Sequence, residues 1–465
     1  MDVEALTIVD AARRLASGEL SAVAMTRACL DRIEARRDLG AFITVLADAA
    51  MADAQDADRD LAAGHRRGAL HGIPVSLKDV FDVRGVRTSA ASRLRDDHVA
   101  HDDATVVARL RAAGAVLIGK CNLHELALGT TSAESAYGPV RNPFDPTRVA
   151  GGSSGGSAVA VRTGMSLASI GTDTGGSIRI PAAACGVVGL KPSWNEVPTS
   201  GILPLSRTLD HVGLMTKTVP DAAVVFHALT GRTAEVPSPA DGVAGLRLGV
   251  PRAYFYDLLD DEVRARADEA IDRLRASGAH VADVDIVDAA ESSRLYPRIM
   301  LAEAFAYHRP TLDARADRYG EALRAQLDAG RYLAEDDYVR ARAGRGRLRA
   351  AVDAALESAP CDALALPTLP IPAPPIGEAT VDVGGSATAI DALMLRQTQA
   401  FGLSGHPAIS LPCGFTANGL PCGLQLVGRR GATDRLLHVA SACELLVAVA
   451  PASRIARAVG ARHCS

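Results

Sequence analysis

Residues 151–193 read GGSSGGSAVAVRTGMSLASIGTDTGGSIRIPAAACGVVGLKPS, and this stretch decides how the rest of the chain is interpreted. It contains two glycine- and serine-rich turns, at residues 151–157 and 175–177, on either side of an apolar helix and a buried strand. A flexible linker would instead have polar, low-complexity neighbours. Because glycine is needed where the backbone takes a positive φ or approaches another group closely, the two turns indicate a site and not a spacer.

The first turn contains a G-x-S-x-G match centred on Ser153, the pattern of a serine nucleophile on a tight turn. A serine beside such glycines can attack an acyl carbon while nearby backbone N–H groups bind the developing oxyanion. It also needs a base, which is usually histidine. Of the 12 histidines, His71, His124 and His211 lie near strand ends, and each is more typical of a packed or surface side chain. The sequence therefore favours a different base.

Lysine is the alternative base. Residues 71–83, HGIPVSLKDVFDV, read as a short apolar strand that brings Lys78 to its end. A partly buried lysine can lose its charge and accept a proton near neutral pH. A simpler interpretation is a strand-end lysine that reaches toward solvent and pairs with Asp79. Both interpretations stay open on these residues alone.

The flanking sequence alternates between helices and strands. Thr7 and Ser21 are suited to cap two amphipathic helices at the start of the chain. A helix over residues 104–114 then feeds a buried strand at 115–119, and the same order recurs after Asp260. A helix that feeds an apolar strand is typical of a parallel sheet with helices on both faces.

The C-terminal part continues this pattern. Residues 321–357 read as one long helix, charged and rich in alanine. Residues 367–377, PTLPIPAPPIG, predict a rigid extended loop, because proline interrupts regular structure. Residues 407–415 and 420–428 then read as further core strands. The proline-rich loop is therefore expected to cross within one domain and not to link two.

The overall composition limits the class of protein. The chain has 465 residues, of which 48% are hydrophobic and 22% charged, an ordinary globular balance. The formal net charge of -4 gives no basic field that would attract nucleic acid or anionic lipid. No signal peptide or long apolar run is present, and the eight scattered cysteines form no C-x-x-C pair. We therefore expect a cytoplasmic protein with no membrane span and no nucleic-acid partner.

Two motifs suggest functions that their context disfavours. Residues 114–121, GAVLIGKC, match G-x-x-x-x-G-K, but Cys121 stands where a phosphate loop needs serine or threonine. The intervening apolar residues favour a buried strand. Residues 340–349, RARAGRGRLR, carry five arginines that could contact RNA. The acidic residues 335–337 just before them favour a solvated helix face instead.

Residues 151–193 resemble the defining segment of the amidase signature family of serine hydrolases, and residues 72–79, GIPVSLKD, resemble its lysine motif. The spacing agrees with the family pattern, because Ser153 follows Lys78 by 75 residues and Ser177 follows Ser153 by 24. The resemblance continues through RNPFDP (141–146), PAISLPCG (407–414) and GLPCGLQLVG (419–428), so it covers most of the chain.

This resemblance implies a fold. A single large α/β domain would span residues 1–465, with a mixed central sheet covered by helices on both faces. The signature core would occupy about residues 70–215. The C-terminal half, residues 240–465, would complete the sheet and the substrate pocket.

The resemblance also implies a Ser-cisSer-Lys triad. Ser177 would be the nucleophile, Ser153 would follow a cis peptide bond and relay the proton, and Lys78 would be the final base as a neutral amine. The oxyanion hole would consist of the backbone N–H groups of Thr174, Gly175, Gly176 and Ser177. The residues expected to support the site are Ser154, Thr172, Asp173 and Arg179, with Arg179 as a partner for Asp173.

Two functions share such a site. The first is a stand-alone amidase that hydrolyses a C–N bond of a small carboxamide, aryl amide, urea or carbamate through an acyl-enzyme. The alternative is the A subunit of a tRNA-dependent amidotransferase, its glutaminase component. That component usually carries a Tyr-Gly-Arg-Val-Ser type run after the KP motif, where this chain reads KPSWNEVPTSGILPLS (191–206). It usually also has an acidic residue where Gly431 and Ala432 stand here, so the sequence favours the stand-alone amidase.

The substrate side of the site is less defined. Residues 126–135, 194–204 and 396–407 are candidate walls of the pocket. A lining made by Leu395, Phe401 and Leu403 would favour an apolar or aryl acyl group, and Trp194 could also face the pocket. No metal-ligand constellation is visible, so we expect a small amide-type substrate with no cofactor and no metal, and a homodimer stays open.

Overall fold

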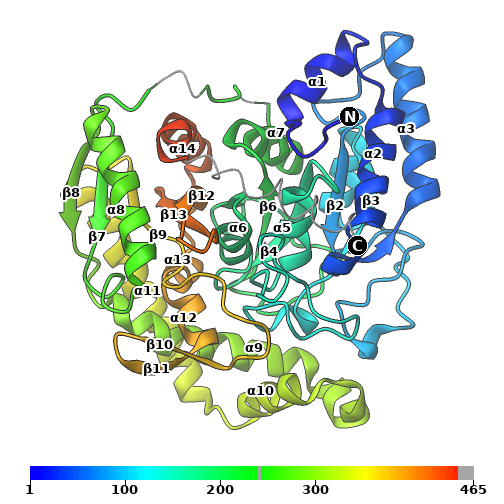
Figure 1. The fold of residues 1–465 in the computed structure, drawn as a ribbon. Coiled ribbons are helices and arrows are strands. Elements are labelled where there is room, and N and C mark those ends of the chain that lie inside the picture. Colours follow the sequence, from blue (N-terminus) through cyan, green and yellow to red (C-terminus); the bar gives the residue numbers. More distant parts are fainter. Residues whose placement is uncertain (234, 239–241, 449–465) are drawn as a thin grey trace, which may run out of the picture.

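The computed structural model describes residues 1–233, 235–238 and 242–448, and these form a single α/β domain (Figure 1). One eleven-stranded sheet runs through it in the order β1-β3-β2-β4-β6-β5-β12-β13-β9-β7-β8. Its strands are β1 (Phe42–Val45), β2 (Pro74–Lys78), β3 (Val116–Cys121), β4 (Ala168–Asp173), β5 (Val188–Lys191), β6 (His211–Thr216), β7 (Arg247–Pro251), β8 (His280–Val284), β9 (Ala363–Pro367), β12 (Ala408–Phe415) and β13 (Pro421–Val427). A separate hairpin joins β10 (Thr380–Val383) and β11 (Ser386–Ala389).

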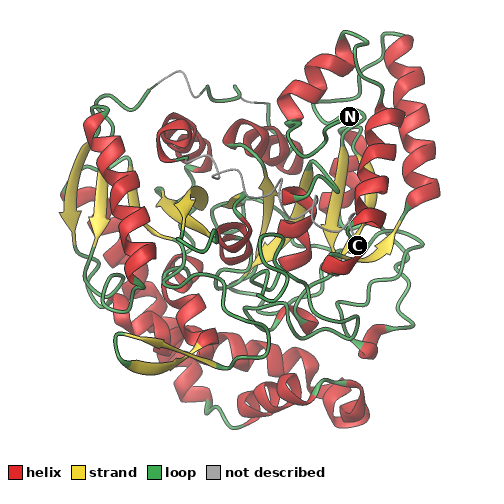
Figure 2. Ribbon diagram, in the orientation of Figure 1, coloured by secondary structure: helices red, strands yellow, loops and turns green. Residues whose placement is uncertain are grey.

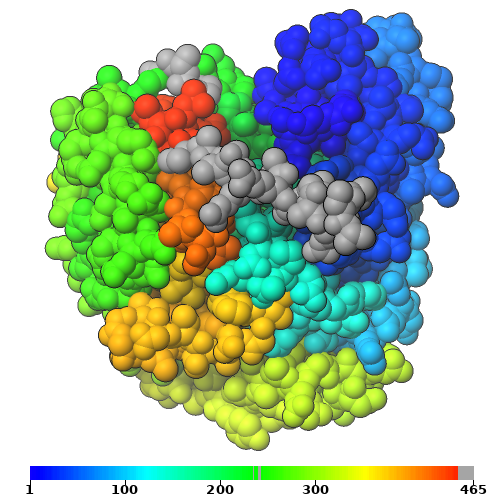
Figure 3. All heavy atoms as spheres, viewed as in Figure 1, coloured from blue at the N-terminus to red at the C-terminus, as the bar shows by residue number. Residues whose placement is uncertain are grey.

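Helices flank the sheet (Figure 2). They are α1 (Ile8–Ala16), α2 (Ala22–Ala35), α3 (Ala47–Ala62), α4 (Thr105–Ala112), α5 (Gly155–Arg162), α6 (Arg179–Cys185), α7 (Val219–Thr230), α8 (Asp261–Ala276), α9 (Ser292–Arg315), α10 (Glu321–Arg331), α11 (Glu335–Ser358), α12 (Ile390–Arg396), α13 (Gln399–Ser404) and α14 (Thr433–Val447). The N-terminal helices α1–α3 form the blue lobe at one side of the molecule, and helices α9–α12 lie along its lower side (Figures 1 and 3).

The sheet is mixed, which confirms the predicted fold class. Strands β3, β2 and β4 run parallel, and so do β8, β7 and β9. The central strands β6, β5, β12 and β13 pair antiparallel with their neighbours. The two parallel groups follow from the helix-then-strand order of the sequence, because a crossover helix returns the chain to the same edge of the sheet.

Several local predictions are confirmed. The side chains of Thr7, Ser21 and Asp260 accept backbone N–H groups at the starts of α1, α2 and α8. The predicted strands at residues 407–415 and 420–428 are β12 and β13.

The single long helix predicted over residues 321–357 is wrong. The chain forms α10 and α11, which are separated by residues 332–334. Residues 335–337 are acidic and occupy the first turn of α11, where they favour a helix start through the helix dipole. Gly330, near the end of α10, lies so close to α9 that a Cβ would be 2.5 Å from the Leu301 carbonyl oxygen. Gly330 therefore allows the end of α10 to pack closely against α9.

The arginine-rich residues 340–349 lie on α11 and only partly form a solvated face. Arg340 pairs with Asp337 at 2.8 Å on the surface, as expected. Arg345 is buried, and its Nε donates to the Leu403 carbonyl oxygen at 2.6 Å, while Arg349 donates to the Ser404 carbonyl at 3.0 Å. These two arginines fix the end of α13 against α11.

Two further observations bear on the predictions about cellular context. Seven cysteines lie among the described residues, and all seven are buried and free, whereas Cys464 lies outside the described residues. Within the described ranges, none of the helices combines the length and apolar character required to cross a membrane.

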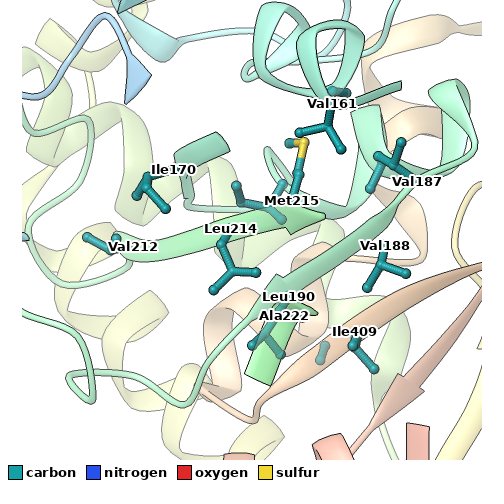
Figure 4. Close-up of a cluster of buried hydrophobic side chains, with 14 of the residues drawn as sticks. Val161, Ile170, Val187, Val188, Leu190, Val212, Leu214, Met215, Ala222 and Ile409 are labelled. Atoms are coloured by element: carbon teal, nitrogen blue, oxygen red, sulfur yellow. The ribbon is translucent and has the colours of Figure 1, made fainter. Parts of the chain in front are cut away.

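The register of three neighbouring strands places apolar side chains next to one another in the core. Leu214 on β6 is paired with Ile170 on β4 and with Leu190 on β5. All three side chains are fully buried, and Figure 4 shows them with Met215 and Ile409 in one apolar cluster. This cluster supports the strands that lead into the functional turns.

Leu214→Ala should lower the free energy of unfolding by about 2–5 kcal/mol, because it leaves a cavity in a close-packed layer. Urea unfolding followed by circular dichroism measures the change. Leu445→Ala is the matched control, since Leu445 is 68% exposed, and it should cost less than about 0.5 kcal/mol. Equal costs for the two variants would contradict the central position of Leu214.

Candidate active site

The site forms where two neighbouring strands end. Strands β2 and β4 are paired in parallel, so their carboxyl ends lie at the same edge of the sheet. Lys78 is the last residue of β2, and Asp173 is the last residue of β4. The turn of residues 174–178 then leads from β4 into α6, and Ser153 precedes α5.

Lys78 is held by two hydroxyl groups. Its Nζ donates to Ser153 Oγ at 2.7 Å and to Thr172 Oγ1 at 2.8 Å, and the side chain is 0% exposed. Burial lowers the pKa of Lys78 to about 7, against the opposing charges of Asp210 and Asp173. An amine with this pKa is in large part uncharged at neutral pH and can accept a proton.

Asp79 does not pair with Lys78, so that alternative for Lys78 is wrong. The Asp79 carboxylate binds Lys120 Nζ of β3 at 2.7 Å, and it accepts a hydrogen bond from Ser89 N at 2.9 Å. Successive side chains along a strand point to opposite faces, which separates Asp79 from Lys78. Most of the G-x-x-x-x-G-K stretch is the buried strand β3 (Val116–Cys121), which agrees with the strand predicted at residues 115–119.

The structure brings the two serine turns together. The peptide bond between Gly152 and Ser153 is cis. Ser154 N donates to the Ser177 carbonyl oxygen at 3.2 Å, and Ser154 Oγ donates to the Thr172 carbonyl at 3.2 Å. Ser154 therefore joins the two turns, and its side chain does not cap α5. Ser177 is buried with 8% of its surface exposed, whereas Ser153 and Ser154 are 0% exposed.

Ser153 is fixed by a segment that the sequence placed only among the candidate walls. Its carbonyl oxygen accepts a hydrogen bond from His124 N at 3.0 Å and one from Ser132 Oγ at 3.2 Å. Ser132 Oγ in turn accepts from Gly155 N at 3.1 Å, at the start of α5. No local motif pointed to Ser132, because this contact forms only when distant parts of the chain meet.

Asp173 and Arg179 form the predicted pair. Both side chains are 0% exposed, and Arg179 donates to the two Asp173 oxygens at 2.8 and 2.9 Å. Burial alone would raise the pKa of Asp173, but Arg179 lowers it to about 2. Arg179 Nη1 also donates to the Thr398 carbonyl at 2.9 Å and to Gln425 Oε1 at 2.8 Å. The pair thus ties the turn to the C-terminal half of the chain.

The glycines of the second turn have no room for side chains. A Cβ on Gly175 would lie 2.5 Å from the Tyr296 ring, and a Cβ on Gly176 would lie 2.6 Å from Ile180 Cδ1. Among the described residues, no hydrogen bond engages the backbone N–H groups of Gly175, Gly176 and Ser177. These groups are therefore available as donors to an oxygen atom at the turn.

Thr174, the first residue of this turn, is held by a carboxylate. Its Oγ1 donates to Asp210 Oδ1 at 2.7 Å. Asp210 and Thr172 also line a hollow of about 310 Å³, together with residues 199–202, Pro204, Arg207 and His211. The sequence analysis did not single out Asp210. The segment 194–204, by contrast, was predicted as a wall, and part of it lines this hollow.

Two histidines near the site, His211 and His124, are engaged in local hydrogen bonds. His211 Nδ1 bonds the Leu209 carbonyl at 2.7 Å, and burial holds the pKa of this imidazole well below its ordinary value. His124 Nδ1 accepts from Ser132 N at 3.2 Å. Both rings serve the local structure.

Three of the expected lining residues lie elsewhere. Phe401 and Leu403 are 0% exposed, and Phe401 stacks on Phe255 in the core. Trp194 is 42% exposed, and it contacts the Arg345 guanidinium at 5.8 Å from the ring centroid. The proposed lining by Phe401 and Leu403 is therefore wrong, because both side chains are engaged in packing between α13 and its neighbours.

Comparisons with known proteins agree with this geometry. The sequence matches the family described as Amidase over residues 24–437. It is 37% identical to a protein of Geobacter metallireducens that is named as the A subunit of glutamyl-tRNA(Gln) amidotransferase, with 96% of this chain and 98% of the relative covered.

Two solved structures are also close. A crystal structure described as an amidase has a TM-score of 0.90 at 38% identity and covers 95% of this chain and 100% of that one. The peptide amidase of Stenotrophomonas maltophilia has a TM-score of 0.82 at 32% identity, with 96% and 98% covered. The chain therefore belongs to the amidase signature family, and it is an enzyme of the class that hydrolyses C–N bonds.

Arg179→Met should lower the free energy of unfolding by about 3–5 kcal/mol, because it leaves the buried Asp173 carboxylate without its partner. Chemical unfolding at pH 7 measures this. Arg340→Met is the matched control, since Arg340 is 69% exposed and its surface pair with Asp337 should be worth at most about 1 kcal/mol. Similar costs for the two variants would contradict a structural role for the Asp173–Arg179 pair.

Proposed function

We propose that this chain is a stand-alone amidase that cleaves a C–N bond through an acyl-enzyme on Ser177. The observation that carries the proposal is the hydrogen bond of 2.7 Å between Lys78 Nζ and Ser153 Oγ. It joins a fully buried lysine, whose pKa is lowered to about 7, to a serine beside the second turn. Ser177 lies on the neighbouring turn, whose backbone carbonyl accepts a hydrogen bond from Ser154 N at 3.2 Å, and this proximity supports Ser177 as the nucleophile of the proposal.

The proposed chemistry begins at Ser177 Oγ, which attacks the carbonyl carbon of the substrate. The Ser177 proton passes to Ser153 Oγ, whose own proton passes to the neutral amine of Lys78. The carbonyl oxygen becomes an oxyanion, and it is bound by the backbone N–H groups of the turn at Thr174, Gly175 and Gly176. Each such donor is worth about 3 kcal/mol of the reaction barrier.

Collapse of this intermediate breaks the C–N bond. The leaving nitrogen takes a proton from Ser153, which regains one from Lys78, so Lys78 returns to its neutral form. Water then attacks the acyl group on Ser177 and gives its proton through Ser153 to Lys78; collapse breaks the bond to Ser177 Oγ, which takes the proton back along the same path, so that the acid product and free Ser177 result. Because Lys78 must be uncharged to accept the first proton, activity should rise with pH through about 7.

The proposed substrate class is a small carboxamide, an aryl amide, a urea or a carbamate. The similarity to a peptide amidase supports a stand-alone enzyme, because that protein carries the name of an amidase and covers the same length of chain. We propose no cofactor, because the serine and lysine side chains supply the nucleophile and the base.

A second candidate is the A subunit of a tRNA-dependent amidotransferase. It is favoured by the 37% identity, over almost the full length, to a relative with that name. In that case the chain would work with partner subunits and a tRNA, contrary to the expectation of no nucleic-acid partner. Two features argue against it: residues 191–206 depart from the usual run, and Gly431 and Ala432 stand where an acidic residue is usual.

A hydrolysis panel with the purified chain alone distinguishes the candidates. The panel contains aliphatic amides, anilides, ureas, carbamates and glutamine. We expect turnover of at least one of the first four classes without a partner protein. Ser177→Ala should abolish it, and Lys78→Ala should lower it by about 10³-fold or more, because both remove groups used in the chemical step.

A fluorophosphonate probe should also label Ser177, as found by peptide mass spectrometry. Labelling of Ser153 or Ser154 would reverse the assignment of the nucleophile. Turnover of glutamine only, and only with added amidotransferase partner subunits, would favour the second candidate. Substantial activity of Ser177→Ala on the same substrate would overturn both.

A further inference from the structure

Asp210 connects the second turn to a neighbouring loop. It lies directly before β6, and its Oδ1 accepts the Thr174 hydroxyl group at 2.7 Å. Its Oδ2 accepts the backbone N–H of Leu205 at 2.9 Å, and Ser206 N lies 3.1 Å from both oxygens. The carboxylate therefore closes the loop of residues 205–210 and holds Thr174 at the same time.

Asp210 also acts on the base. Its negative charge is the largest of those that raise the pKa of Lys78, against the stronger lowering by burial. Asp210 is half-buried and shares the hollow with Thr172, whose Oγ1 accepts a hydrogen bond from Lys78 at 2.8 Å. Burial raises the pKa of Asp210 itself to about 6, so it is mostly ionised at pH 7.

Helix α9 makes this arrangement rigid. Glu303 on α9 accepts Ser206 Oγ at 2.8 Å and Thr208 Oγ1 at 2.6 Å, which fixes the loop that carries Asp210. Tyr296, two turns earlier on the same helix, packs directly over Gly175 of the turn. One helix therefore supports both partners of the Thr174–Asp210 hydrogen bond.

We propose that Asp210 is a positioning residue for this site: it holds Thr174 so that the N–H groups of the turn face the oxyanion, and its charge lies in the hollow beside Thr172, the hydrogen-bond partner of Lys78. The inference rests on the proposed function. It differs from the expected role of Asp173, because Asp173 is neutralised by Arg179 at 2.8 Å. Asp210 has no ion-pair partner among the described residues. Its negative charge is therefore not neutralised by an arginine or lysine, as that of Asp173 is by Arg179.

Other charged and titratable groups surround Lys78 and Asp210. They are Asp173, Arg179, Lys191, Arg207, His211, Tyr296 and Glu303. His211 stays neutral, because burial holds its pKa well below the ordinary value. Burial also lowers the pKa of Lys191 well below the ordinary value. All of these groups are unchanged in the variants below. A comparison of the variants therefore reports the effect of the Asp210 carboxylate and of its Thr174 anchor.

Two variants separate the two roles of Asp210. Asp210→Asn removes the charge and disturbs the hydrogen bonds, whereas Thr174→Val removes the hydroxyl anchor and keeps the carboxyl group, whose pKa should rise because the Thr174 hydrogen bond lowers it. Asp336→Asn is the control, because its side chain is 84% exposed on α11. The readout is the rate of Ser177 labelling by a fluorophosphonate between about pH 5 and pH 9, which needs no knowledge of the substrate.

We expect the labelling rate of the unchanged chain to rise with pH as Lys78 loses its proton. In Asp210→Asn the midpoint of that rise should move to lower pH by about 0.5 unit or more, since a nearby negative charge no longer favours the charged amine. The limiting rate should fall by about tenfold or more, because the turn is less well placed. Thr174→Val should lower the limiting rate and move the midpoint less than Asp210→Asn does, because the carboxyl group of Asp210 remains.

The outcomes are distinguishable. If Ser177 of the unchanged chain is not labelled, the proposed function itself fails. If it is labelled, and Asp210→Asn keeps both the midpoint and the limiting rate of Asp336→Asn, the inference is overturned. Thermal unfolding shows whether Asp210→Asn folds. If it does not, Thr174→Val decides, and labelling at the unchanged rate would overturn the positioning role.

Discussion

The hydrogen bond between Lys78 Nζ and Ser153 Oγ is the interaction on which the site depends. A lysine that is 0% exposed cannot keep its charge without cost, and here its partners are two neutral hydroxyl groups and no carboxylate in direct contact. The parallel pairing of β2 with β4 creates this environment, because it brings Lys78 beside Thr172 at one edge of the sheet. The carboxylate of the next residue, Asp79, forms an ion pair with Lys120 and not with Lys78.

The second requirement is a rigid turn at residues 174–177. Asp173 and Arg179 hold it from the side of α6, and Asp210 holds Thr174 from the side of β6. Arg179 also reaches Gln425 on β13, so the C-terminal half supports a turn that lies 246 residues earlier. The site is therefore assembled from the whole length of the domain, which agrees with the extent of the similarity to other amidase signature proteins.

Local sequence patterns predicted the helix caps and the positions of the lysine and serine motifs. They could not predict contacts between segments that are far apart in the sequence. The caps at Thr7, Ser21 and Asp260 depend on residues within one helical turn, so the sequence shows them directly. The lysine and serine positions were set by spacing within recognisable motifs. Asp210 and Ser132 had no such signal, because their roles arise only when distant segments meet. Phe401 was misplaced because an apolar residue in a candidate wall has the same pattern whether it faces a ligand or the core.

The charge state of Lys78 is the most direct test of the account. Lysine side chains labelled with ¹³C at the ε-carbon can be titrated by NMR in the folded protein, and Lys78→Arg identifies the Lys78 signal by its loss. If Lys78 is the base, its titration midpoint should lie near 7, well below the ordinary lysine value of 10.5. A signal that stays that of a charged amine up to about pH 10 would contradict the role of Lys78 as the base.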